Sequence, residues 1–523
     1  MDYRKGKNRD QLFMTSLESV VSEDSWARVV DIFVDALPIE DFGFKNGQLN
    51  REGNIPYHPR DLFKLLIYGY RKRIRSAEQL SEACRINLEV MWLLKGLTPS
   101  PRKINYFRSN NAQAIEKAHR HFVKLLQGWQ FIDGKVLALD STKIRGQNSL
   151  KNNFNEKKIK RHLKFIDGKI SDYLDDLSEL EDRKPTALLK EKKEMIMDKI
   201  EDLQQRRETY QDLDQMVRQS EDGQISLSDP EAKAVIHHRN IVQVGYNIQT
   251  TVDSKNKMVV DVFAGGVTDR SDLGTASKRA QDLLEVETID LLADAGYHNG
   301  AEIAYCERRG VRTFIPPGNQ HYQKAEGYRK IDFKYDKEND VYICPAGEQM
   351  VHIQTFKKKN SKRKYRVKRY GTPACAGCCF RSECTSSKSG RYIERPMHQE
   401  HTERNDRRVK RYPAFYRQRQ AIIEHIFGTW KRQWQLTHTI LYGKENTVTE
   451  YILASIAYNL TRLASIKGKK WMKEQLKGLK NAIICYFNIV MLNGASVSHT
   501  ECQNSSNLTA LIACHNSKIW ERK

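Results

Sequence analysis

The stretch "VLALDSTKIRG", residues 136–146, decides how the fold of this chain is interpreted, because four apolar residues run directly into an aspartate. An apolar run without alternation is typical of a strand that is covered on both faces, although a short buried helix has the same pattern. Asp140 is then expected where the strand leaves the core. In open sheets that carry helices, ligands bind beyond the carboxyl ends of the strands. Asp140 is therefore a candidate site residue, and the alternative is a turn cap, the commoner role of a single aspartate in such a place.

A second acid has the same setting, which makes the site interpretation stronger. The stretch "TIDLLADAGYHNG", residues 288–300, is another apolar strand that ends on an acid, Asp294, followed by small residues. The order of the surrounding patterns predicts a mixed sheet with helices packed against it. The predicted elements are the strand ending at Asp140, a hairpin at 244–253 and 257–266, a helix from a serine cap at 271–286, the strand ending at Asp294, a helix at about 299–309 and a strand at 311–317.

A third acid lies on a predicted helix near the end of the chain. Residues 414–433, "AFYRQRQAIIEHIFGTWKRQ", have an apolar face, and Glu424 falls beside it between Ile423 and Ile426. A glutamate at such a place is costly to bury without a partner. We therefore expect a basic residue or a cation to neutralise it.

The composition points to a polyanionic partner. The 523 residues include 88 Lys and Arg against 65 Asp and Glu, a net charge of +23, with a pI near 9.4. The excess favours nucleic acid, and it is clustered at 357–370 and 404–420, where tyrosines are interleaved. No apolar run reaches the roughly 18 residues that span a bilayer, and no signal-peptide core follows the N-terminus. We expect no membrane partner and a cytoplasmic protein.

Two further segments have clear helical patterns. Residues 56–108 read as several short helices, with Arg71, Lys72, Arg73 and Arg75 at one junction. They resemble a helix-turn-helix DNA binder, and a structural bundle with solvated charges is equally consistent. Residues 150–220 predict two helices folded back on each other, because helical spacing is interrupted at Pro185.

Three acids on two strand ends and a helix resemble the catalytic centre of the DDE transposases of bacterial insertion sequences. The resemblance extends from about residue 50 to 465. It implies an α/β fold with an RNase-H-like mixed sheet flanked by helices. The motifs that carry it are "YHPRDLFKLLIYGY" and "EACRINLEVMWLLKGLTP" in the N-terminal helices, "LALDSTK" and "LLADAGY" at the aspartates, "YRQRQAIIEHIFGTWKR" at the glutamate and "ASIAYNLTRL" after it.

The resemblance also implies a chemistry for these residues. Asp140 would bridge two Mg²⁺ (or Mn²⁺) ions, with Asp294 and Glu424 each completing one site. Mg²⁺ prefers oxygen ligands, and two such ions can activate a nucleophile and stabilise the leaving oxygen. Lys431 would contact a DNA phosphate, unless it is an ordinary solvated helix lysine.

Tyr416 and Arg419 would join the DNA contacts, but one spacing departs from the wider group. Its signature leaves two, three and six residues between Tyr, Arg, Glu and Lys. Here six lie between Glu424 and Lys431, but four lie between Arg419 and Glu424. The assignments of Tyr416 and Arg419 therefore rest on a weaker match than those of the other two.

The implied reaction is hydrolysis at the element's ends followed by transesterification into target DNA. The implied partner is double-stranded DNA, both the terminal inverted repeats and the target, bound by a homodimer. The implied location is the bacterial cytoplasm, at the nucleoid when DNA is bound. The alternatives are an inactive or domesticated DNA-binding relative, and a metal-dependent nuclease without strand transfer.

The cysteines are too sparse for a disulfide scaffold, and five of the ten lie between 344 and 384. Cys344, Cys375, Cys378 and Cys384 could form a structural Zn²⁺ site with four thiolates, although Cys379 makes the choice ambiguous. Free thiols in a loop-rich insertion are the alternative.

These patterns together predict a chain of several parts. "NAIICYFNIVML" near the end is apolar enough for a buried helix or strand, and "GASVSHTECQNSSN" reads as a loop. The predicted parts are an all-α DNA-binding domain at 1–125, a core at 131–149 and 221–317 split by a helical-hairpin insertion at 150–220, a basic Cys-containing insertion at 318–410, the glutamate helix and end of the core at 411–465, and a tail at 466–523.

Overall fold

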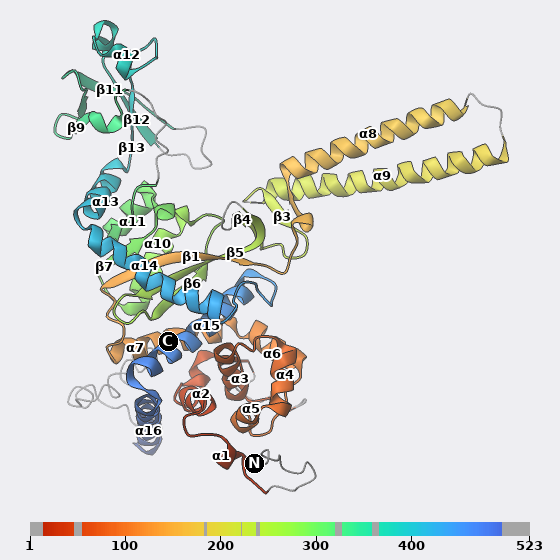
Figure 1. Ribbon diagram of the computed structural model, residues 1–523, viewed down its shortest axis with the longest axis vertical. Helices are drawn as coiled ribbons and strands as arrows, with labels where there is room; N and C mark the ends of the chain where they lie inside the picture. Colours follow the sequence, from red (N-terminus) through yellow and green to blue (C-terminus); the bar gives the residue numbers. More distant parts are fainter. Residues whose placement is uncertain are drawn as a thin grey trace, which may run out of the picture. The chain divides into compact units, whose positions relative to one another are not determined.

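The computed structural model describes residues 14–45, 55–181, 186–220, 222–236, 241–318, 327–357 and 366–493 (Figure 1). The chain forms two compact units. The first unit consists of Met1–Asp133, Ser141–Thr268 and Glu424–Lys523, and the second of Gly134–Asp140 and Asp269–Ile423. Strand β1 (Val136–Arg145) and helix α14 (Pro413–Phe427) each run from one unit into the other.

The first unit contains a helical bundle, which includes the several short helices predicted at 56–108. Pro59 is the first residue of its helix, and Ser76 Oγ accepts the N–H of Gln79 at 3.3 Å. Helix α15 packs against α3, α7 and strand β6 of this unit. The helices are α1 (Leu17–Val20), α2 (Trp26–Asp35), α3 (Pro59–Lys72), α4 (Ala77–Ile86), α5 (Leu88–Leu93), α6 (Pro101–Asn110), α7 (Ala112–Gly128), α15 (Lys444–Lys467) and α16 (Lys469–Asn493).

Basic residues at the junction after α3 make contacts inside the bundle. The Arg71 guanidinium lies 4.4 Å from the centre of the Trp26 ring, and Lys72 Nζ lies 2.9 Å from a Glu89 oxygen. Arg75 Nη1 lies 3.5 Å from Oε2 of Glu450, which is completely buried in α15. These contacts favour the structural bundle over a DNA-reading helix at this junction, because three of the four charges already have partners and only the exposed Arg73 has none among the described residues.

The strands of the first unit include the predicted hairpin. Strand β5 (Val242–Asp253) pairs antiparallel with β6 (Val259–Ala264) on one side and with β4 (Lys233–Ile236) on the other. The last part of β1 also meets β5, since the N–H of Gly146 donates to the carbonyl of Val244 at 2.9 Å. A β-carbon on Gly245 would lie 1.8 Å from the carbonyl oxygen of Ile144, so only glycine fits there.

The insertion after β1 is the predicted pair of helices. Helices α8 (Glu156–Glu181) and α9 (Ala187–Gln219) run beside each other as a long hairpin (Figure 1). Short strands β2 (Asn153–Asn155) and β3 (Gln224–Ser226) pair at its base. Pro185, the predicted break, lies outside the described residues.

The second unit contains the other predicted strands and helices. Strands β1, β7 (Ile289–Ala293) and β8 (Val311–Phe314) are parallel neighbours, with α10 (Leu273–Leu284) and α11 (Gly300–Arg308) between them in the chain. The predicted serine cap of α10 is wrong, because the cap residue is Asp272 and its side chain makes no capping bond. The α/β class is confirmed.

The insertion that follows is a sheet and not a loop-rich segment. Its five strands pair antiparallel in the order β13-β12-β11-β10-β9 around a small core that includes Tyr342, Met350 and Tyr370. The strands are β9 (Lys334–Asp336), β10 (Val341–Ile343), β11 (Gln349–Lys357), β12 (Arg366–Gly371) and β13 (Ile393–Pro396), with the short α12 (Arg381–Cys384) between the last two and α13 (Gln399–Arg411) after them. In the described residues no helix combines the length and apolarity needed to cross a membrane.

Candidate active site

Two neighbouring parallel strands bring Asp140 and Asp294 to the same level of the sheet. Leu139 is paired in register with Ala293, so the next residue of each chain segment is an aspartate. Both side chains are half-buried. Strand β7 ends at Ala293, as predicted for Asp294. Strand β1 continues to Arg145, so the expectation that Asp140 lies at the exit of its strand is wrong; the strand goes on because its last residues meet β5.

Local hydrogen bonding distinguishes the two acids. Asp294 Oδ1 accepts the N–H of Gly296 at 2.9 Å and caps the short turn η5 (Ala295–Tyr297). Asp140 lies within a strand, so it does not have the turn-cap role that was its alternative interpretation. Asp294 is therefore partly committed to the local fold as a turn cap, and Asp140 is not a turn cap.

Helix α14 places a cation directly on Asp140. Arg419 Nη1 lies 2.8 Å from Asp140 Oδ2, and the two side chains are 19% and 22% exposed. Burial opposes the charged form of Arg419, but the charge of Asp140, together with Tyr416 and Asp294, raises the pKa of the guanidinium above its ordinary value. Arg419 is thus a cation that neutralises Asp140 in this structure.

Tyr416 lies one helical turn before Arg419, and the same carboxylates affect the pKa of its hydroxyl. Burial raises the pKa of its hydroxyl, Arg419 acts in the opposite direction, and Asp294 and Asp140 raise it further. Asp140, Asp294, Tyr416 and Arg419 therefore come together within the second unit. Tyr416 and Arg419 were selected from the sequence despite the irregular spacing between Arg419 and Glu424.

Another acid, Asp269, lies beside this group and was not selected from the sequence. A β-carbon added to Gly296 would lie 3.0 Å from Asp294 Oδ1 and 3.6 Å from Asp269 Oδ2, so both carboxylates border the same glycine. His298 Nε2 also lies 2.9 Å from Asp406 Oδ1, one turn further along. Asp269 stands in "TDRSDLG", just before the predicted helix at 271–286, for which a serine cap was the only start signal named.

Glu424 and Lys431 belong to the first unit. Both side chains are exposed, while Ile426 and Trp430 beside them are buried. The expected burial cost at Glu424 is therefore absent. After Phe427 the helix continues as the π-helical turn η8 (Gly428–Gln433), which contains Lys431 and in which the N–H of Trp434 donates to the carbonyl of Thr429. Turns of this kind often occur at functional sites.

The donor atoms of the second unit fit a hard cation. Asp140 and Asp294 offer carboxylate oxygens, which Mg²⁺ prefers. Arg419 occupies one Asp140 oxygen, so a metal at that atom would replace an existing ion pair. Nowhere in the described ranges are three or more His, Cys, Asp or Glu side chains arranged to hold a metal.

The cysteines of the five-stranded sheet lie near one another. Cys344 and Cys384 pack against the same small core. Burial raises the pKa of the Cys384 thiol, and Cys375, Cys378 and Cys344 add to that shift, whereas Arg391 opposes it. Cys379 is exposed. Cys344 and Cys384 thus share one core, but the four cysteines named for zinc do not form a metal-holding group in the described ranges, and no disulfide joins any of the described cysteines.

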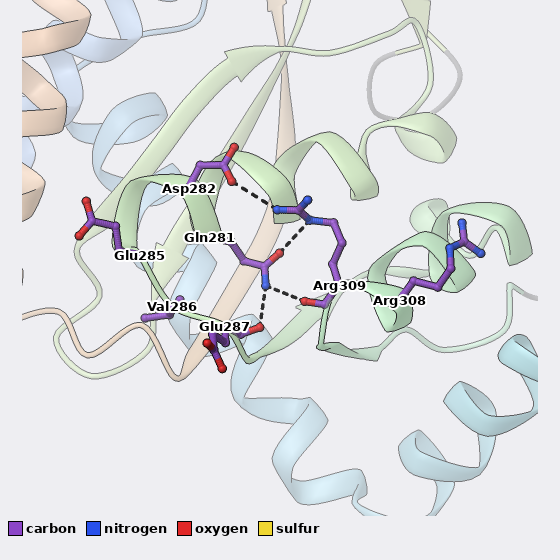
Figure 2. A pocket seen from close by; sticks show the side chains of 7 residues that line it. All are labelled: Gln281, Asp282, Glu285, Val286, Glu287, Arg308 and Arg309. Atoms are coloured by element: carbon purple, nitrogen blue, oxygen red, sulfur yellow. Dashed lines mark hydrogen bonds and ion pairs between the residues drawn. The ribbon is translucent and has the colours of Figure 1, made fainter. Parts of the chain in front are cut away.

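A separate pocket in the second unit does not offer comparable chemistry (Figure 2). Gln281 Nε2 donates to the carbonyls of Glu287 and Arg309, and Arg309 also contacts the Asp282 carboxylate at 3.3 Å. The side chains of Gln281, Asp282 and Arg309 therefore already bond to one another. The pocket includes none of the residues that the sequence analysis selected.

Two family models match the chain. The model described as "Transposase DDE domain" matches residues 343–464, and the model described as "Transposase domain (DUF772)" matches residues 15–110. The first of these matches contains Glu424 and Lys431 but neither Asp140 nor Asp294. No curated protein matches the chain. A solved structure described as "Cryo-EM structure of piggyBac transposase synaptic complex with hairpin DNA" is similar at 11% identity and a TM-score of 0.29, over 93% of this chain and 83% of that one.

Proposed function

We propose that this chain, which its two family matches confirm as a relative of the DDE transposases of insertion sequences, cuts DNA at the ends of a mobile element and joins those ends to target DNA. The observation that carries the proposal is the register of β1 and β7, which puts Asp140 and Asp294 side by side. In the proposal Glu424 is the third acid. The core is then an RNase-H-like sheet with the two insertions described above.

The roles of the residues follow from their chemistry. Asp140, Asp294 and Glu424 would hold divalent ions, Mg²⁺ or Mn²⁺, which when bound activate the attacking hydroxyl and stabilise the leaving oxygen. Arg419 would have to leave Asp140 Oδ2 for a metal to bind at that atom. The freed guanidinium can then bind a DNA phosphate, for which its planar donors are well suited. Tyr416 and Lys431 are the other proposed phosphate contacts.

In each step of the reaction one P–O bond forms and one P–O bond breaks. In the first step water attacks a phosphodiester at the element's end, and the products are a 3′-hydroxyl and a 5′-phosphate. In the second step that 3′-hydroxyl attacks a phosphodiester of the target, whose own 3′-oxygen leaves. Two ends must meet for joining, so we propose a homodimer on DNA, in the cytoplasm at the nucleoid.

The test uses labelled double-stranded DNA that carries the repeats flanking the coding sequence. Nicking is measured with Mg²⁺, with Ca²⁺ and with EDTA for wild type and for Asp140→Asn, Asp294→Asn and Glu424→Gln. The matched control is Asp282→Asn, an acid of the same unit in the separate pocket. We expect Mg²⁺-dependent nicks that the three variants lose and the control keeps, with DNA binding intact in all.

Other outcomes identify the alternative functions. Binding without any nicking by wild type would indicate a DNA-binding relative without catalysis. Nicking without joined product, when a free 3′-hydroxyl end is supplied, would indicate a nuclease. Nicking that persists in the three variants would place the active site elsewhere.

A structural Zn²⁺ ion held by Cys344, Cys375, Cys378 and Cys384 is also part of the proposal. Its support is the packing of Cys344 and Cys384 on one core, with the charges of Cys375 and Cys378 acting on Cys384. Four thiolates are a common structural zinc set. Metal analysis should find about one zinc per chain, lost in Cys378→Ser and kept in Cys379→Ser, whose thiol is exposed. Protein free of zinc at full solubility would contradict this part alone.

A further inference from the structure

Helix α8 has a marked separation of charge along its length. Residues 156–169, next to strand β2, include six Lys or Arg and two acids, whereas residues 170–181 include five acids and neither Lys nor Arg. Both acids of the first segment are paired, Glu156 with Lys160 at 2.6 Å and Asp167 with Arg207 at 2.8 Å. The base of the hairpin is therefore positive and its outer part negative.

Three of the basic residues have no partner in the described part of the chain. Lys157, Arg161 and Lys164, which we call the basal stripe, are exposed and form no ion pair there. Their neighbours differ in this respect. Lys169 pairs with Asp172 at 3.0 Å, and Lys158 Nζ donates to the carbonyls of Leu150, Lys151 and Asn153.

The basal stripe lies on one face of the helix. Its residues are spaced by four and then three positions, which places them above one another on a helix surface. At about 1.5 Å per residue the stripe is roughly 10 Å long. This length corresponds to about three phosphates of one DNA strand at roughly 3.4 Å each along the duplex axis. Phe165, exposed beside Lys164, adds an apolar group that can lie against a sugar.

The positive charges of this region act together on His162. Burial lowers the pKa of His162, and Lys158, Arg161 and Arg206 lower it further. Such an arrangement does not help the hairpin to fold. Like charges four residues apart destabilise a helix by about 0.2–0.5 kcal/mol, and cations in the first turn oppose the helix dipole. The basal stripe therefore does not serve to stabilise helix α8.

We propose that the basal stripe, Lys157, Arg161 and Lys164, binds consecutive phosphates of double-stranded DNA. The proposal rests on the proposed function for the presence of DNA, and it adds a contact surface on the helical hairpin. The acidic outer part of the hairpin repels phosphate. Only the base of the hairpin therefore contacts the duplex.

The test compares two variants that remove the same charge from the same hairpin. One is Lys157→Ala with Arg161→Ala and Lys164→Ala. The control is Lys190→Ala with Lys192→Ala and Lys193→Ala in the outer part of α9, where the nearby segment of α8 is acidic. Binding of the full chain to a labelled duplex is measured by anisotropy over a range of NaCl concentrations. Circular dichroism checks helix content, which alanine should maintain.

The expected result is a change in the slope of log affinity against log salt concentration. Each phosphate contact contributes about 0.9 to that slope, so the basal variant should be shallower by about 2.7. The outer variant should keep the wild-type slope. Equal slopes in all three proteins, or an equal loss in both variants, would overturn the proposal while leaving DNA binding itself in place. Absence of duplex binding by wild type would instead contradict the proposed function as well.

Discussion

Asp140 and Arg419 form an ion pair of 2.8 Å in which both partners are about four-fifths covered. The carboxylate proposed to bridge two metal ions is thus already neutralised by a side chain of the same unit. A metal ion and a guanidinium cannot occupy the same lone pairs of Asp140 Oδ2. Metal binding and release of Arg419 are therefore expected to be coupled.

The first prediction concerns this competition. Arg419→Ala should bind Mn²⁺ more tightly than wild type in the absence of DNA, because no ion pair has to be broken. The expected gain is at most about 1 kcal/mol, roughly fivefold, since the pair is partly solvated. Calorimetric titration with Mn²⁺ measures it. Arg417→Ala is the matched control, because Arg417 is exposed and has no ion pair among the described residues. Weaker Mn²⁺ binding by Arg419→Ala would contradict the competition.

The second prediction concerns His121 of α7, which packs against Phe42 with ring centres 5.6 Å apart. Burial lowers the pKa of His121 from 6.5 to about 4, so the folded chain resists a proton that the unfolded chain binds. The free energy of unfolding is unaffected by His121 above pH 6.5, where this side chain is neutral in both states. It falls as the pH drops towards 4, because only the unfolded chain then binds the proton. His121→Phe should therefore gain stability relative to wild type in that window, by on the order of 3 kcal/mol at most. Urea midpoints between pH 4 and 7.5 measure the difference, and a constant difference would exclude the histidine as its cause.

At the scale of elements, the helices and strands with apolar periodicity could be predicted from the sequence. The hairpin of β5 and β6 and the paired helices α8 and α9 are examples. The five-stranded sheet could not, because most of β11 is exposed and the basic run at 357–370, which includes β12, dominated the pattern of this segment. The continuation of β1 past Asp140 was missed for a different reason. It depends on pairing with β5, whose sequence lies about a hundred residues away.

The third prediction tests the close approach of β1 and β5. Gly245→Ala would place a β-carbon 1.8 Å from the carbonyl oxygen of Ile144, so the strands must separate. We expect a loss of several kcal/mol in the free energy of unfolding or failure to fold, as for other backbone clashes. Gly168→Ala in α8 is the control, because nothing lies within 4 Å of its added β-carbon. That variant should gain up to about 1 kcal/mol. Urea unfolding compares the two, and similar stability of both variants would contradict the structure at β5.

At the scale of the whole molecule, the excess of positive charge is not spread evenly over free surfaces. Arg75 pairs with buried Glu450, and Arg404 and Arg408 share Glu307. The 88 Lys and Arg residues are therefore more than the basic side chains available to DNA. The sequence could not reveal these pairs, because their partners are far away in the chain. It could place Tyr416 and Arg419 with the aspartates only through the family resemblance.

Asp140, Asp294 and Glu424 are proposed to hold the divalent ions of a DNA strand-cutting site. Replacing each carboxylate by a thiolate is the sharpest test of this proposal. Asp140→Cys, Asp294→Cys and Glu424→Cys are assayed for nicking of the element's ends in Mg²⁺ and in Mn²⁺, with Asp282→Cys as control. A thiolate is a poor ligand for Mg²⁺ and a better one for Mn²⁺. We expect each of the three variants to lose nicking in Mg²⁺ and to recover part of it in Mn²⁺, while the control nicks in both. The proposal would be wrong if any of the three variants nicked DNA in Mg²⁺ at the wild-type rate. It would also be wrong if none of the three recovered nicking in Mn²⁺.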